Sequence, residues 1–187
     1  KANPNCKVIH KPDVWKLICK DDSATVKIEV NGIKRGIIES TEDKILCDKA
    51  QSEFAMACKA RTVSFSQLYG GKIAAALARQ HPRDLFDCKY MNIKSFDEVK
   101  NGFILALLGS DKPIIESLQP NTINQKESLE NQFKGMSDIP FNYEDYETSR
   151  ATLIKMVNDN LNEQDRRFLL SFEKGQPQWY ICCAGDL

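Results

Sequence analysis

The stretch at residues 68–87, LYGGKIAAALARQHPRDLFD, constrains the fold of this chain more than any other. Its alanine-rich part favours a helix, and Tyr69, Ile73 and Leu77 recur at the spacing of one buried stripe. Pro82 has the fixed φ that suits the first turn of a helix and cannot continue the preceding one. The sequence therefore predicts two consecutive helices joined by a tight His-Pro turn.

Both predicted helices carry charged residues. Lys72 and Arg79 are seven positions apart, so they project from one side at roughly 10 Å spacing and suit an anion. Arg83, Asp84 and Asp87 share a sector of the second helix. A purely structural interpretation is also open: Arg83 pairs with Asp87, Asp84 favours the helix start, and Lys72 and Arg79 are solvated.

The same stretch carries a family resemblance. GGK-x3-AL-x-R-x3-RDLFD resembles the second half of the signature of the AbiEii/AbiGii nucleotidyltransferases, which are toxins of abortive-infection and type IV toxin–antitoxin systems. Two further segments also resemble this family and occur in the same order as in it: VKIEVN at residues 26–31 and RRFLLSFEKGQPQW at residues 166–179. The resemblance implies an α+β fold, with a small N-terminal β-sheet portion of a nucleotidyltransferase domain at residues 1–62 and a mostly α-helical C-terminal bundle at residues 63–187.

The resemblance also implies an activity: magnesium-dependent transfer of a nucleotide from a nucleoside triphosphate to an RNA acceptor, including tRNA 3′ ends. Lys72 would bind the triphosphate, and Asp87 would orient Lys72 or assist the attacking hydroxyl. Glu29 would supply the third carboxylate of a two-magnesium site, although an exposed polar residue on a half-buried strand is the ordinary interpretation of Glu29. The implied catalytic residues are Glu29, Lys72 and Asp87, and the implied nucleotide-binding residues are Lys72, Arg79, Arg83 and Asp84.

One part of the superfamily pattern is missing from these residues. The superfamily places a Gly-Ser or Gly-Gly turn and an Asp-x-Asp pair ahead of the strand that resembles residues 26–31. Here the nearest acidic pair is Asp21-Asp22, whose adjacent side chains would face opposite sides of a strand. We therefore expect a truncated chain whose remaining metal ligands lie outside it, and which is inactive on its own.

Periodicity outlines the remaining elements. Residues 7–31 alternate as three strands, Asn31-Gly32 favours a hairpin turn, and residues 33–38 follow as a returning strand. Ser64 or Ser66 would cap the helix that carries Lys72. Further helices are expected at residues 48–60, 96–109, 114–119, 124–136, 149–161 and 163–172, with the acidic segment NYEDYETS as a loop.

Composition limits the partners and the location. Lysine plus arginine equal aspartate plus glutamate at 26 each, so any contact with nucleic acid requires a local patch. No apolar run reaches membrane-spanning length and no signal peptide is visible, which favours the cytoplasm and argues against a membrane partner. The seven cysteines are odd in number and lack a C-x-x-C pair, so we expect reduced thiols, with Cys182 and Cys183 packing in an apolar tail.

Two functions of other classes stay open. The chain could be a non-catalytic helical module that binds a cognate antitoxin or the rest of its own enzyme through an exposed apolar patch. In that case the RDLFD cluster would be a network of salt bridges. A basic RNA-binding domain without chemistry is disfavoured by the neutral net charge and the lack of an aromatic-rich basic strand.

Overall fold

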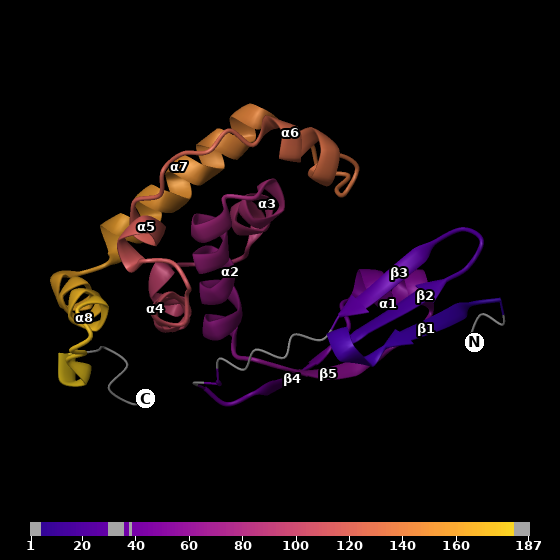
Figure 1. Cartoon of the computed structure of the whole chain (residues 1–187), viewed down its shortest axis with the longest axis horizontal. Helices are drawn as coiled ribbons and strands as arrows, with labels where there is room; N and C mark the ends of the chain where they lie inside the picture. The colour runs from indigo at the N-terminus through magenta and orange to yellow at the C-terminus, as the bar shows by residue number, and fades with distance from the viewer. Residues whose placement is uncertain (1–4, 30–35, 38, 182–187) are drawn as a thin grey trace. The chain divides into compact units, whose positions relative to one another are not determined.

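A computed structural model describes residues 5–29, 36, 37 and 39–181 of the chain (Figure 1). The chain divides into two compact units, residues 1–36 and residues 37–187. The predicted turn at Asn31-Gly32 and the Cys182-Cys183 pair lie outside the described residues, as does most of the strand predicted at residues 33–38.

The first unit is a three-stranded antiparallel sheet. Its strands are β1 (Lys7–Lys11), β2 (Lys16–Lys20) and β3 (Thr25–Glu29), in the spatial order β1-β2-β3. A 3-10 turn, η1 (Pro12–Val14), joins β1 to β2. The carboxylate of Asp21 closes the next turn by accepting the backbone N–H groups of Ser23 and Ala24, at 2.9 and 2.8 Å. The three strands predicted from alternation are confirmed.

The second unit opens with a two-stranded antiparallel ribbon, β4 (Glu42–Ile45) and β5 (Lys59–Thr62), which flank α1 (Asp48–Phe54). The helix predicted over residues 48–60 is wrong in its second half. The chain leaves the helix at Ala55, which adopts a left-handed φ of 47°. Residues 59–62 then pair with β4, and Phe54 at the end of α1 is 70% exposed.

Helices make up the rest of the second unit and confirm the α+β class. Short elements are η2 (Phe96–Glu98), α5 (Ile114–Leu118), α6 (Lys126–Ser128), the π-helical η3 (Leu129–Phe133) and η4 (Trp179–Ile181). The longer helices are α2 (Phe65–Arg79), α3 (Pro82–Tyr90), α4 (Lys100–Leu108), α7 (Tyr143–Asn160) and α8 (Glu163–Glu173).

The core of this unit forms where α2 packs against α4, beside which α3, α7 and α8 complete the bundle (Figure 1). Ile73 and Leu77 of the predicted stripe are buried, and Tyr69 packs at its edge. Ser64 caps α2 by accepting the backbone N–H of Gln67 at 3.1 Å. The core side chains contributed by the other helices include Phe103, Leu107, Tyr146, Val157 and Phe168.

Helix α7 begins well before the predicted start. Asn142 and Asp145 form a capping box, in which each side chain accepts the backbone N–H of the other residue. Tyr146, in the segment expected to be a loop, is completely buried. The acidic composition of this segment suits a helix N-terminus, because carboxylates there interact favourably with the helix dipole. The loop prediction for NYEDYETS is therefore wrong.

Asp145 also ties α7 to α3. Lys89 Nζ donates to Asp145 Oδ1 at 2.7 Å, and this bond, aided by the backbone N–H of Asn142, holds the pKa of Asp145 below its ordinary value of 3.8. Because the folded carboxyl binds its proton less tightly than the unfolded one, its stabilising effect is present above about pH 4 and is lost as the pH falls through the lowered pKa.

We therefore expect Asp145→Asn to lower the free energy of unfolding near neutral pH, and we expect this loss to shrink as the pH falls through the lowered pKa, because the wild-type carboxyl then becomes protonated as well. Urea unfolding across this pH range measures the difference. A loss of the same size at both ends would contradict the assignment.

Candidate functional site

Four of the residues singled out from sequence, Lys72, Arg79, Asp84 and Asp87, line one open pocket of about 230 Å³ between α2 and α3. Its lining consists of Leu68, Gly71, Lys72, Ala75, Arg79, Asp84 and Asp87. The positions on α2 are Leu68 and the residues 3, 4, 7 and 11 places after it, a pattern that places them on a single side of that helix. Gly71 and Ala75 are small, so this side of α2 is hollow between its two cations.

A tight turn directs α3 back toward this side of α2. Gln80 ends α2 in the left-handed conformation, with a φ of 50°, and its backbone N–H donates to Ala76 O. His81 caps α3 by accepting the backbone N–H of Arg83 at 3.2 Å, and Pro82 occupies the first turn. The buried hydroxyl of Tyr146, on α7, donates to Gln80 O at 2.9 Å and so stabilises the turn between α2 and α3.

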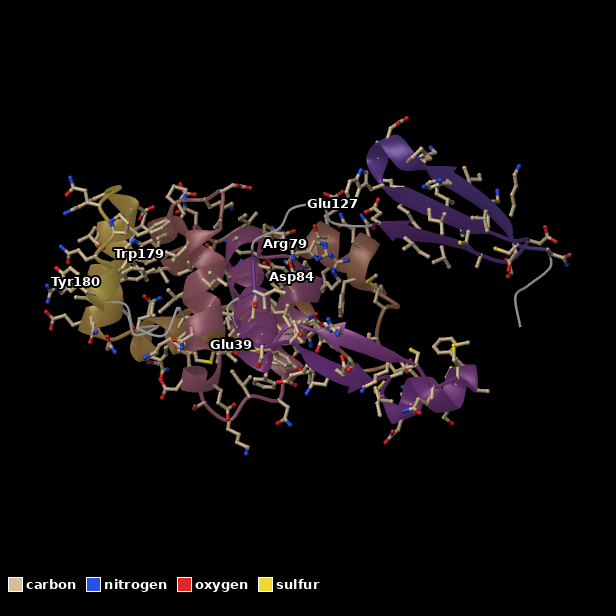
Figure 2. All side chains as sticks on the ribbon, turned by 90° about the horizontal axis from the view of Figure 1, so that it is seen from below. Glu39, Arg79, Asp84, Glu127, Trp179 and Tyr180 are labelled. Atoms are coloured by element: carbon tan, nitrogen blue, oxygen red, sulfur yellow. The ribbon has the colours of Figure 1, made fainter. Side chains whose placement is uncertain are left out.

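Two ion pairs connect the helices across the pocket. Lys72 Nζ lies 2.5 Å from Asp87 Oδ2, and Arg79 Nη2 lies 2.9 Å from Asp84 Oδ1. Figure 2 shows the Arg79 and Asp84 side chains next to each other. The alternative in which Lys72 and Arg79 are only solvated and Asp87 pairs with Arg83 is therefore wrong. Each cation of α2 instead has its own carboxylate from α3.

The two pairs differ in burial. The side chains of Lys72 and Asp87 are each 41% exposed, so this pair is open to solvent and to ligands. The side chain of Asp84 is only 11% exposed, and its second oxygen, Oδ2, is buried and lacks a hydrogen-bond partner among the described residues. Buried carboxylate oxygens are normally satisfied. Within the part of the chain that the structure describes, Arg79 is thus the side chain that binds the Asp84 carboxylate.

Two other predicted site residues lie elsewhere. Arg83 is exposed on α3 and is not among the residues that line the pocket. Glu29 belongs to the first unit, on β3, and is 51% exposed there. Its carboxylate pairs with Lys16 at 2.8 Å and with Lys27 at 3.7 Å. The hydrogen bond from Lys16 is the main cause that lowers the pKa of Glu29.

A magnesium site needs several hard oxygen ligands in one place. Within the described ranges no three side chains of His, Cys, Asp or Glu gather closely enough to hold a metal ion. Glu29 already faces two ammonium groups, and the pocket carboxylates Asp84 and Asp87 are each paired with a cation. These residues do not by themselves fit a two-metal centre, so we derive no catalytic step through a metal.

The two glycines of α2 serve different purposes. A Cβ at Gly70 would lie 2.2 Å from the backbone nitrogen of Phe103, so this glycine permits the contact with α4. A Cβ at Gly71 would have nothing within 4 Å. Of these two glycines, only Gly71 therefore leaves open space beside the charged side chains of the pocket. The buried contact of Tyr146 with the turn was missed, because its segment resembled a loop.

Comparison with known proteins identifies one family. Residues 10–181 match the model of one protein family, described as "Nucleotidyl transferase AbiEii toxin, Type IV TA system". This match covers most of the chain and includes all of the residues that line the pocket. Neither the curated proteins nor the solved structures contain a significant match. In the described part of the chain, no helix combines the length and apolar character needed to cross a membrane.

Proposed function

Because the chain belongs to the AbiEii family of nucleotidyl transferase toxins of type IV toxin–antitoxin systems, we propose that it transfers a nucleotide from a nucleoside triphosphate to an RNA acceptor, including tRNA 3′ ends. The observation that carries this proposal for the chain's own residues is that two cations of α2, Lys72 and Arg79, line one open pocket, where a carboxylate of α3 pairs with each of them. A cognate antitoxin is the protein partner that we propose on the family membership.

The pocket suits the phosphate part of the nucleotide. Its volume of about 230 Å³ is below the range of about 300–1,000 Å³ typical of sites that enclose a whole small molecule. The Lys72 ammonium has three N–H donors and the Arg79 guanidinium has five, so both keep donors for phosphate oxygens while they pair with α3. We propose that the polyphosphate lies over the hollow at Gly71 and Ala75, with the base outside.

In nucleotidyl transfer the acceptor hydroxyl oxygen forms a bond to the α-phosphorus and loses its proton. The bond from the α-phosphorus to the oxygen that bridges to the β-phosphate breaks, and negative charge grows on the departing pyrophosphate. A cation fixed beside that charge stabilises the transition state without a covalent intermediate. Lys72 would fill this role, and Asp87 would hold its Nζ in place. Arg79, anchored by Asp84, would neutralise a second phosphate. Arg83 would contact the acceptor or an outer phosphate, since it lies outside the pocket lining.

Magnesium remains part of the proposal through the family resemblance alone. Glu29 would contribute one carboxylate, and the other ligands would come from residues outside those described.

A transfer assay tests the function. The chain and the complete product of its gene are each incubated with magnesium, total RNA and one labelled nucleoside triphosphate at a time. We expect label on RNA from the active form and its loss in Lys72→Ala. The matched control is Lys155→Ala, which removes a lysine that is also ion-paired, to Asp159 on the exposed side of α7. No transfer to any RNA, by either form, would reject the transferase in favour of a binding module.

A further inference from the structure

The register of the first sheet separates its side chains into two faces of opposite character. Because side chains alternate along each strand, Val8, Leu17, Val26 and Ile28 share one face. The opposite face carries five lysines, called here the lysine face: Lys7, Lys11, Lys16, Lys20 and Lys27. The ion pairs of Glu29 with Lys16 and Lys27 confirm that these three residues project from the same side.

Positive charge is concentrated on the lysine face. Glu29 is the one acidic residue whose strand position places it there, against five lysines, whereas the whole chain has 26 residues of each sign. The other described acids of this unit, Asp13, Asp21 and Asp22, lie in the turns. Among the described residues, Lys7, Lys11 and Lys20 have no ion-pair partner. This is the local patch that contact with a polyanion requires.

Two features of this face oppose folding. Lys7 lies directly opposite Lys20, and Lys11 lies directly opposite Lys16. Like charges in such cross-strand pairs are destabilising. Lysines on edge strands discourage unwanted strand pairing, and this explains Lys7, Lys11 and Lys27. It does not explain Lys16 and Lys20, because β2 is hydrogen-bonded on both sides. Lys16 has Glu29 directly opposite it on β3 and is ion-paired to it, but Lys20 lies between Lys7 and Thr25 on this central strand and needs another reason.

The spacing of the cations favours an extended ligand. Lys7 and Lys11 are four residues apart on one strand, as are Lys16 and Lys20, so each row spans about 13 Å. A single phosphate reaches only one or two of these ammonium groups, whereas a nucleic-acid strand presents a phosphate to each in turn. The lysine face carries no aromatic side chain for stacking on bases. Contacts there would be with the backbone and would not depend on sequence.

From these observations we propose that the lysine face of β1–β3 binds the phosphate backbone of a nucleic acid. The binding itself does not depend on the proposed function. If the chain is a nucleotidyltransferase, this face is the surface for its RNA acceptor, separate from the residues of the nucleotide pocket. An anionic membrane is a poorer fit, because among the described residues of this face the apolar side chains between the lysines are Ile9 and Ile18, and no aromatic anchor accompanies them.

The test measures binding of the chain to a fluorescent single-stranded RNA of mixed sequence over a series of salt concentrations. The triple variant Lys7→Gln/Lys11→Gln/Lys20→Gln removes three cations without breaking an ion pair. We expect Kd to rise at least about tenfold and the slope of log Kd against log salt to fall by about 2, since each phosphate contact on a single strand contributes about 0.7. Lys134→Gln/Lys155→Gln/Lys174→Gln removes three exposed lysines elsewhere and should change Kd less than about twofold.

A second variant distinguishes a direct effect on RNA binding from a loss of binding caused by misfolding. Glu29→Gln removes the acid from the lysine face and should tighten RNA binding, a gain that an unfolded protein cannot produce. Equal weakening by both triple variants, or no change with Glu29→Gln, would overturn the proposal. Tighter binding to phosphatidylserine vesicles than to RNA, lost in the same triple variant, would overturn it in favour of a membrane surface. Loss of transfer in Lys72→Ala with RNA binding intact would separate this surface from the pocket.

Discussion

Gly102→Ala is expected to lower the free energy of unfolding by about 3 kcal/mol or more, a large effect for the addition of one methyl group. A Cβ at this position would lie 2.0 Å from the carbonyl oxygen of Ser66 and 2.4 Å from its carbonyl carbon. Because these are backbone atoms, no side-chain rotation relieves the overlap. Helices α4, which carries Gly102, and α2, which carries Ser66, would have to separate, and the core between them would lose contacts.

Gly70 makes the reciprocal contact from α2. A Cβ there would lie 2.2 Å from the backbone nitrogen of Phe103 and 2.4 Å from the carbonyl carbon of Gly102. The hydroxyl of Ser66 also accepts the backbone N–H of Gly102 at 3.1 Å, which fixes the crossing point. Gly70→Ala should therefore destabilise the protein as Gly102→Ala does. Their combination should cost less than the sum, since one separation of the helices relieves both overlaps.

Gly71→Ala is the matched control for this prediction. It changes the neighbouring residue of the same helix, but the added Cβ meets nothing within 4 Å. Alanine is a better helix former than glycine, so stability should stay the same or rise by up to about 1 kcal/mol. Urea unfolding followed by circular dichroism measures all three variants. If Gly102→Ala were as stable as Gly71→Ala, the close crossing of α2 and α4 would be wrong.

These glycines show what the sequence predicts and what it leaves open. Helix α2 was predictable, because Ser64 supplies a cap and Ile73 and Leu77 an apolar stripe. The role of Gly70 was not, since its neighbour Gly102 lies on another helix and no local pattern links the two. The same limit applies to α7, whose start depends on a capping box of Asn142 and Asp145. The acidic segment resembled a loop because it is polar. The backbone N–H group that Asp145 binds in the capping box leaves no pattern of side chains in the sequence.

The candidate site was predictable to a similar degree. Helical spacing placed Lys72 and Arg79 on one side of α2, as the structure confirms. The choice of Asp87 and not Arg83 as the residue that turns toward Lys72 depends on the direction of α3. That direction is set by the left-handed Gln80 and by the hydrogen bond from Tyr146, which comes from a helix far along the chain. Sequence spacing within α3 alone favoured the wrong pair.

Lys72→Ala is expected to reduce the rate of nucleotide transfer by about 100- to 1,000-fold, the effect of removing one donor aimed at developing charge. Stability should change little, because the Lys72–Asp87 pair is 41% exposed on both sides and exposed pairs contribute at most about 1 kcal/mol. A normal unfolding curve together with the lost rate would therefore assign the effect to the chemistry and not to the fold.

Asp87→Asn distinguishes the two roles considered for Asp87. If the carboxylate only positions Lys72, the single variant should lose about 10- to 100-fold in rate, and the double variant Lys72→Ala/Asp87→Asn should be no slower than Lys72→Ala, since the group to be positioned is already gone. If Asp87 instead takes the proton of the attacking hydroxyl, the two losses should multiply and the pH dependence of the rate should change in Asp87→Asn. The distance of 2.5 Å between Lys72 Nζ and Asp87 Oδ2 favours the first result, because this carboxylate oxygen already accepts a hydrogen bond from the ammonium group.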